Sequence, residues 1–166
     1  MVLTFPRSRR GGSCARPLMG LVPALKKNIT PLMKYIFETQ LEVRDYECDI
    51  EGIVNNANYL HYIEHTRHLF LKSLGVSFAE MHAKGVDAVV ARMSMQFKVP
   101  LRCDDMMRSC LSLKKEGVRY VFNQDLYREA DGKLAFRAKV ELVCIVNGQL
   151  AMTSPYDEVF KDVLQE

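Results

Sequence analysis

An aspartate, a glycine and two asparagines stand directly before the most helical stretch of this sequence. The run CDIEGIVNNANYLHYIEHTRHLFL covers residues 48–71 and places Asp49 a few residues before Asn55 and Asn56, either of which can cap a helix. First-turn backbone N–H groups lack intrahelical acceptors and carry the positive end of the helix dipole. A helix beginning here could hold negative charge on a carbonyl oxygen, as an oxyanion hole does. Asp49 would then supply the carboxylate needed for attack on an activated acyl group.

Each of these residues also has a purely structural interpretation. Asp49 could cap its own turn, and Gly52 would permit an unusual backbone conformation under either interpretation. We expect Asn58 to fix the loop by a hydrogen bond rather than to contact substrate. Tyr59 is expected to belong to the helix core, because aromatic residues at helical spacing more often pack than react.

The same helix contains a second motif that could do chemistry. His61, Glu64 and His65 match the H-x-x-E-H pattern of some zinc proteases, with both histidines on one helix face. A zinc site also needs a third protein ligand, for which Glu141 is a candidate. Five residues with two free positions match easily by chance, so these histidines and His68 are predicted to be surface or interface residues.

Other charged residues have weaker claims to a role. Glu64 could position water or Asp49, but an ion pair with Arg67 or Arg92 is the expectation we favour. The segment 102–105 reads as a solvated turn. Basic side chains that could reach the phosphates of a nucleotide are Arg92, Lys98, Arg102 and Arg108.

Hydrophobic periodicity indicates which elements position these residues. Alternation over 35–44 predicts a half-buried strand. Apolar residues at three- and four-residue steps from Tyr59 to Leu74 predict a helix that ends at Gly75. A loop or short helix is expected over 77–84, further strands over 90–100 and near 106–115, 118–129 and 133–147, and a short helix or extended tail from Ser154 and Pro155.

This order of elements predicts an α+β fold with one long helix on a mostly antiparallel sheet. A single helix covers only one face of such a sheet. Strand 133–147 carries apolar residues on both faces, with Ala135, Val143 and Ile145 on the second. Dimerisation would bury that surplus.

Length and composition restrict the class of protein. The chain has 166 residues, 48% of them hydrophobic, which fits one domain, and no apolar run approaches the ~20 residues of a membrane span. Residues 1–37 hold seven of the 23 Lys and Arg and none of the 20 Asp and Glu, so residues 38–166 carry a net charge of −4. This charge argues against nucleic acid as the main partner. Five cysteines without a C-x-x-C pair indicate free thiols in a reducing compartment.

The basic, Pro- and Gly-rich segment 1–32 is predicted to be a poorly ordered extension of the domain at 33–166. It fits an organellar transit peptide or an artefact of start-site choice equally well, since Met33 directly precedes the first strand pattern. The expected location is the cytoplasm, or a plastid or mitochondrion if residues 1–32 are a transit peptide.

The run VRDYECDIEGIVNNANYLHYIEHTR resembles the opening of hotdog-fold thioesterases of the 4-hydroxybenzoyl-CoA thioesterase type. That pattern is an acid, two variable residues, Gly-hydrophobic-Val, and an Asn-Tyr pair that opens a long aromatic-rich helix. The resemblance covers about residues 35–150, including FKVPLRCDD, but many members have His or a bulky residue where this chain has Asn55 and Asn56. The matching positions are Asp49, Gly52, Ile53, Val54, Asn58 and Tyr59.

The resemblance implies a hotdog fold, in which a curved antiparallel sheet of about five strands wraps a long central helix. It implies a homodimer or homotetramer with active sites at the subunit interface, no metal or other cofactor, and acyl-CoA or acyl carrier protein thioesters as substrates. Asp49 would be the nucleophile or the general base. Asn56, with Asn55, would supply the oxyanion donor, and the supporting residues would be Gly52, Asn58, Tyr59 and Glu64. The alternatives are a non-catalytic acyl-CoA-binding hotdog protein and, with less support, a zinc hydrolase using His61, Glu64 and His65.

Overall fold

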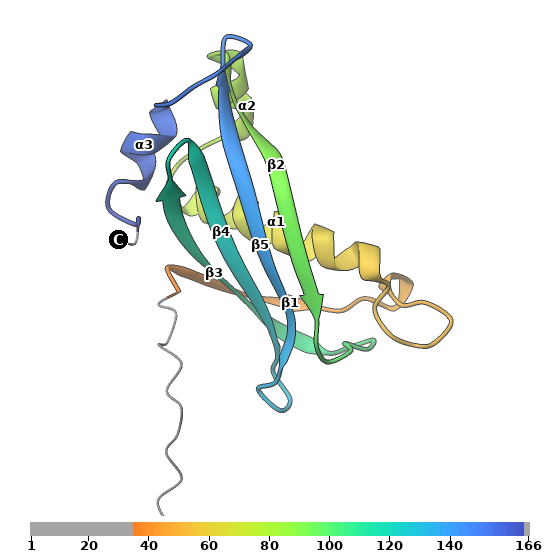
Figure 1. Ribbon diagram of the computed structural model, residues 1–166. Helices are drawn as coiled ribbons and strands as arrows, with labels where there is room; N and C mark the ends of the chain where they lie inside the picture. The colour runs from red at the N-terminus through yellow and green to blue at the C-terminus, as the bar shows by residue number, and fades with distance from the viewer. Residues whose placement is uncertain (1–34, 165–166) are drawn as a thin grey trace, which may run out of the picture. The chain divides into compact units, whose positions relative to one another are not determined.

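The structure is a computed structural model that describes residues 35–164. In this part of the chain, six strands form one antiparallel sheet, and a long helix, α1, runs across one face of it (Figure 1). The strand path is β1-β3-β4-β5-β2, with the short β6 paired to β5. The predicted α+β class and the curved sheet around a long helix are therefore confirmed. The elements in chain order are β1 (Phe37–Glu42), the 3-10 helix η1 (Asp45–Glu47), α1 (Asn56–Ser73), α2 (Phe78–Ala83), β2 (Val86–Phe97), β3 (Met106–Glu116), β4 (Arg119–Arg128), β5 (Leu134–Val146), β6 (Gln149–Leu150) and α3 (Pro155–Phe160).

Helix α1 follows the predicted boundaries closely. It ends at Ser73 with Leu74 as its C-terminal cap, and Gly75 follows with a φ of +74°, the left-handed conformation that glycine adopts at little cost. Its buried face packs on the inner side chains of the sheet; Tyr59, for example, stacks on Phe136 of β5 with ring centroids 4.9 Å apart. Burial of each such ring contributes about 2 kcal/mol, so packing rather than helix propensity holds α1 in place.

The side chains of β4 and β5 that face α1 are buried. Phe122 and Leu126 of β4 face the helix and are buried, as are Phe136 and Val140 of β5. The two hairpin turns carry Gly117 and Gly132 at positive φ and lie between the strands expected near 106–115, 118–129 and 133–147. The short C-terminal helix is also present, with Ser154 as its cap and Pro155 in its first turn.

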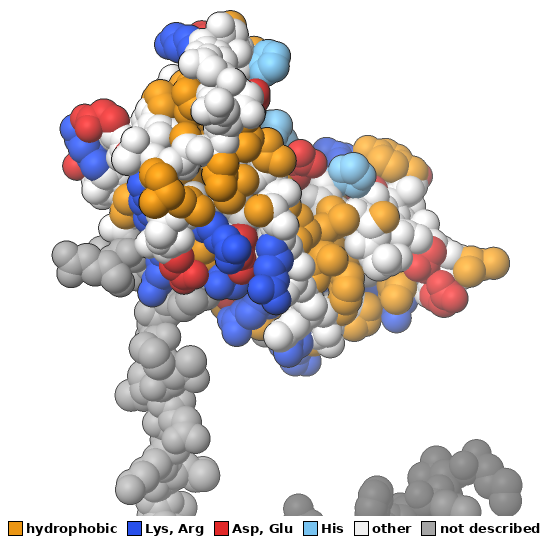
Figure 2. All heavy atoms as spheres, turned by 45° about the horizontal axis from the view of Figure 1, so that its top comes forward, with side chains coloured by type: hydrophobic (Ala, Val, Ile, Leu, Met, Phe, Trp, Pro, Cys, Tyr) orange, Lys and Arg blue, Asp and Glu red, His pale blue; other side chains and the backbone are white. Residues whose placement is uncertain are grey.

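Strand β2 is longer than expected and forms an edge of the sheet. It begins at Val86 rather than near residue 90, and within residues 35–164 it pairs with β5 and no other strand. We expected the surplus apolar surface on the second face of strand 133–147, but there Ala135 is buried and both Val143 and Ile145 are half-buried. Exposed apolar side chains instead lie along β2, beside a group of Lys and Arg side chains (Figure 2). They are Val89, Val90, Met95 and Phe97.

Two further expectations concern the ends of the chain and membranes. The predicted extension over 1–32 lies outside the described residues. Among the helices of residues 35–164, none combines the length and the hydropathy that a membrane crossing requires.

Candidate active site

The loop that carries Asp49 is closed by its own backbone. Cys48 and Val54 form an isolated antiparallel bridge. Inside this bridge, the N–H of Asp49 donates to the carbonyl of Ile53, and the N–H of Gly52 donates to the carbonyl of Asp49, both at 2.9 Å. Gly52 has a φ of +69°, which explains the need for glycine at this position. The loop therefore holds Asp49 in a defined place.

Asn55 and Asn56 have different roles at the start of α1. Asn55 is the cap, because its Oδ1 accepts the N–H of Ala57 at 3.0 Å and its carbonyl accepts the N–H of Asn58 at 2.9 Å. Asn56 is the first helical residue. No group within residues 35–164 accepts a hydrogen bond from the N–H of Asn56, so this donor is free for a ligand.

The side chain of Asn58 bonds to the chain before the Asp49 loop and not to the recess. Its Nδ2 donates to the carbonyl oxygen of Glu47 at 2.7 Å, which is the kind of contact expected of a loop-fixing side chain. The same carbonyl accepts the N–H of Asn55 at 2.9 Å. The two bonds join the residue before the Asp49 loop to the helix that follows it.

Asp49 and the first turn of α1 open into the same recess of about 390 Å³. Asp49 is half-buried, and its Oδ1 accepts the N–H of Glu51 at 3.1 Å. The turn-capping interpretation is thus satisfied by one carboxylate oxygen, while Oδ2 has no hydrogen-bond partner among the described residues. The residues that line the recess are Asp49, Ile53, Val54, Asn56, Tyr59, Phe97, Lys98, Val99 and Pro100.

Two aromatic rings, Tyr59 and Phe97, line this recess, and Phe136 packs against both of them. Tyr59, Phe97 and Phe136 lie in mutual contact, with ring centroids 4.9 to 5.2 Å apart. Tyr59 is 4% exposed, its hydroxyl accepts the N–H of Leu101 at 3.4 Å, and burial raises its pKa. Tyr59 therefore stays protonated and serves as a wall of the site, in addition to its expected place in the core.

The recess opens at the free edge of the sheet. Phe97 ends β2 and is 53% exposed, and Lys98, Val99 and Pro100 continue from it along the rim. Sequence reasoning named Lys98 only among basic residues that could reach a nucleotide. It missed the rest of this rim, because nothing in FKVP shows that this segment lies beside Asp49.

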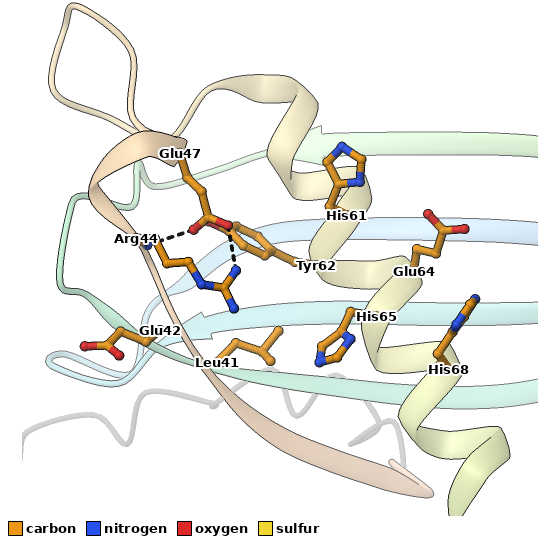
Figure 3. Close-up of a pocket in the computed structure, with 9 residues that line it drawn as sticks. All are labelled: Leu41, Glu42, Arg44, Glu47, His61, Tyr62, Glu64, His65 and His68. Atoms are coloured by element: carbon orange, nitrogen blue, oxygen red, sulfur yellow. Dashed lines mark hydrogen bonds and ion pairs between the residues drawn. The ribbon is translucent and has the colours of Figure 1, made fainter.

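Glu64 does not reach the Asp49 recess. It lines a second recess of about 360 Å³ together with His61, His65 and His68 on the outer side of α1 (Figure 3). We expected Glu64 to form an ion pair with Arg67 or Arg92. That prediction is wrong, because neither ion pair forms among the described residues. Glu64 is exposed, whereas Arg67 turns into the core and its Nη1 donates to Oε1 of Gln124 at 2.8 Å.

The H-x-x-E-H motif does not assemble a metal site here. Within residues 35–164, no three His, Cys, Asp or Glu side chains are grouped so that they could hold a metal ion. Glu141, the candidate third ligand, lies on β5, where it pairs with Arg119 at 2.9 Å and with Lys139 at 3.5 Å. His61 and His65 are exposed, as expected of surface residues.

The remaining basic candidates differ in their surroundings. Nη1 of Arg102 donates to the carbonyl of Gly52 at 3.3 Å, so this side chain supports the Asp49 loop. Arg108 pairs with Glu38 and Glu129 across the sheet. Lys98, which lines the recess itself, is therefore the basic side chain best placed to meet an anionic group at the site.

Residues 43–164, nearly the whole described domain, match the family model of the thioesterase-like superfamily. The chain belongs to this superfamily. The match begins just before the Asp49 loop and includes every residue that lines the recess. The recess therefore lies within the part of the chain that matches the family.

Similar proteins agree with this assignment. The chain is 42% identical over 73 residues to the chloroplast acyl-acyl carrier protein thioesterase ATL3 of Arabidopsis thaliana, a match that covers 44% of this chain but only 38% of that protein. It is 30% identical over 112 residues to the putative acyl-CoA thioesterase YneP of Bacillus subtilis, which covers 67% of this chain and 80% of YneP. The crystal structure of Slr0204, a 1,4-dihydroxy-2-naphthoyl-CoA thioesterase from Synechocystis, superposes with a TM-score of 0.71 at 20% identity, over 76% of this chain and 96% of that one. This last likeness supports the fold.

Proposed function

We propose that this protein hydrolyses acyl thioesters of coenzyme A or of acyl carrier protein to a carboxylic acid and a thiol. The observation that carries the proposal is the shared recess of Asp49 and Asn56. A carboxylate and a free backbone donor at a helix start are the two groups that attack on a thioester carbonyl needs. Membership of the thioesterase-like superfamily supports the same reaction.

In the proposed reaction, the thioester oxygen accepts the N–H of Asn56, which stabilises the negative charge that develops during attack. Asp49 acts in one of two ways. As a base, it takes a proton from water while the water oxygen bonds to the carbonyl carbon. As a nucleophile, its own oxygen bonds to that carbon and water later cleaves the anhydride. In both routes the C–S bond breaks, the thiolate leaves with the electron pair and is protonated, and no metal step is needed.

The apolar walls of the recess suit the acyl part of such a substrate. Ile53, Val54, Phe97 and Val99 line the space around Asp49, and these side chains have no group that would compete for the thioester oxygen. Lys98, at the same recess, is placed to face an anionic part of the thiol component.

We also propose that two copies pair through β2, as a homodimer or within a homotetramer. An edge strand with unpaired backbone groups and exposed apolar side chains is a template for pairing with another strand. Because the recess opens at this edge, pairing would place residues of the second copy at the rim of each site. The active site would then lie at the subunit interface.

The proposed location is the cytoplasm for a chain in which residues 1–32 do not direct transport, and an organelle for one in which they do. A fusion of residues 1–34 to a fluorescent protein distinguishes the two. Colocalisation with a plastid or mitochondrial marker would replace the cytoplasmic proposal.

The activity is tested with a panel of acyl-CoA and acyl carrier protein thioesters, with release of free thiol as the signal. We expect turnover that survives a chelator and falls at least about 100-fold in Asp49→Asn, because the amide is neither a base nor a nucleophile. Tight acyl-CoA binding without turnover would replace hydrolysis with a binding function. Loss of activity with chelator and its return with zinc would favour a metal hydrolase instead.

A further inference from the structure

Glu47 lies two residues before Asp49 and is buried despite its charge, with 6% of its surface exposed. The hydroxyl of Tyr62, a buried residue of α1, donates to Oε2 of Glu47 at 2.6 Å. Arg44 donates to the same carboxylate twice, from its backbone N–H at 2.8 Å and from Nη1 at 3.1 Å (Figure 3). Burial and the bond to Glu47 raise the pKa of Tyr62, which keeps this hydroxyl a donor.

The backbone end of Glu47 makes a second set of contacts with α1. Its carbonyl oxygen accepts the N–H of Asn55 at 2.9 Å and Nδ2 of Asn58 at 2.7 Å. Glu47 thus holds the first turn of α1 through its carbonyl and the second turn, at Tyr62, through its carboxylate. These contacts fix the start of the helix relative to the chain that enters the Asp49 loop.

The Asp49 loop begins and ends at this anchor. It leaves from Glu47, turns at Gly52 and returns at Asn55, whose N–H bonds back to the Glu47 carbonyl. Asp49 lies two residues from one end of the loop, and Asn56 lies one residue from the other. The separation between the carboxylate and the free N–H of Asn56 therefore depends on how firmly Glu47 is held.

We propose that Glu47 is a positioning residue for the thioesterase site, an inference that rests on the function proposed above. Its carboxylate lines the recess of Figure 3, whereas Asp49 and Asn56 line the other recess, so Glu47 acts on the reacting groups through the loop. A buried carboxylate is costly unless donors surround it. Here three donors do so, and two of them tie the carboxylate to the chain just before the loop.

The test compares Glu47→Ala, Glu47→Gln and Tyr62→Phe with Glu42→Ala in the full chain. Glu42 lines the same recess and is exposed, and no described residue makes an ion pair with it, so it is a matched control. We expect Glu47→Ala to lower kcat about tenfold or more with KM within about twofold, since misplacement by 1 Å can cost about 100-fold. Glu47→Gln keeps an oxygen acceptor for Tyr62 and should recover part of kcat, while Glu42→Ala should match the wild type.

Binding of a non-hydrolysable thioether analogue of the best substrate gives a second readout. Its Kd should stay within about twofold in Glu47→Ala, because the recess walls are intact. A Glu47→Ala protein that melts earlier but keeps the kcat of Glu42→Ala would overturn the proposal and leave Glu47 a fold-stabilising residue. If Glu47→Ala does not fold, wild-type kcat in both Glu47→Gln and Tyr62→Phe would overturn it equally.

Asp49→Asn separates this inference from the proposed function. Wild-type turnover in Asp49→Asn would show that Asp49 has no role in the reaction. Glu47 could then have no role in positioning it for catalysis. An inactive Asp49→Asn with full kcat in Glu47→Ala would leave the proposed function standing and remove only the role of Glu47.

Discussion

Arg137 donates from Nε and Nη2 to the two carboxylate oxygens of Asp125, at 2.7 Å each, and Asp125 is completely buried. The pair lies on the face of the sheet opposite α1, since the neighbouring Gln124 bonds to Ile63 of that helix. Hydrogen bonding to Asp125 raises the pKa of Arg137. Such a bidentate pair makes two parallel charge-assisted hydrogen bonds, which are stronger than hydrogen bonds between neutral groups.

The two halves of this pair should have unequal effects on stability. Arg137→Met leaves Asp125 buried and charged, and we expect it to lower the free energy of unfolding by about 3 kcal/mol. Asp125→Asn should cost less, because the half-exposed Arg137 can turn to solvent. Urea unfolding at pH 7 measures both, and equal losses would contradict this interpretation of the pair.

Two substitutions of the helix cap Asn55 should affect stability and kcat differently. Asn55→Ala removes the acceptor for the Ala57 N–H and should cost about 1 kcal/mol of unfolding free energy. Asn55→Asp keeps an acceptor and adds a negative charge that the helix start favours, so its stability should be near that of the wild type. The same charge would oppose an oxyanion held by the neighbouring Asn56, so kcat should fall about tenfold. Full activity in Asn55→Asp would argue against a helix-start oxyanion site.

Asp157 should make the C-terminal helix sensitive to acid. Burial alone would raise its pKa, but bonds from Lys115, Tyr120 and the Ser154 N–H lower it below the ordinary value. A depressed carboxylate pKa adds stability that is complete above the unfolded pKa of about 3.9 and is lost as the pH falls through the folded pKa. The wild type should therefore exceed Asp157→Asn in unfolding free energy at pH 6, with the difference shrinking toward pH 3. A difference that stays constant over this range would show that the charge of Asp157 is irrelevant.

The exposed edge strand gives a prediction about assembly. Met95→Lys places a charge on β2 at the expected contact between copies, and we expect it to convert the protein to monomers and to lower thioesterase activity. Light scattering after size exclusion measures the mass. Leu150→Lys is the control, because Leu150 is also exposed and apolar but lies on β6. Loss of the dimer in the control alone would place the interface elsewhere.

Local signals in the sequence predicted much of this molecule. The Gly75 stop bounded α1, because its positive φ is a backbone conformation that few residues other than glycine adopt. Asp49 and Asn56 line one recess because only six residues separate them, and a turn at Gly52 brings the two ends of such a short loop together.

The features that the sequence did not predict depend on contacts between residues that are far apart in the chain. Strand β2 lies beside β5 although two strands separate them in the chain, and this pairing brings Phe97 and Lys98 to Asp49. The direction of Arg67 was also missed, since its partner Gln124 lies 57 residues away. The η1 turn and the two-residue β6 are too short to give a periodic signal.

The contact of Tyr59, Phe97 and Phe136 would make the alignment of β2 with β5 a condition for the proposed activity. Phe97 lies directly opposite Phe136 in the β2–β5 ladder. A slip of one residue would turn Phe97 to the other face of the sheet and open the wall of the recess. We therefore expect a deletion inside β2 to destroy the recess at Asp49 even in a protein that still folds.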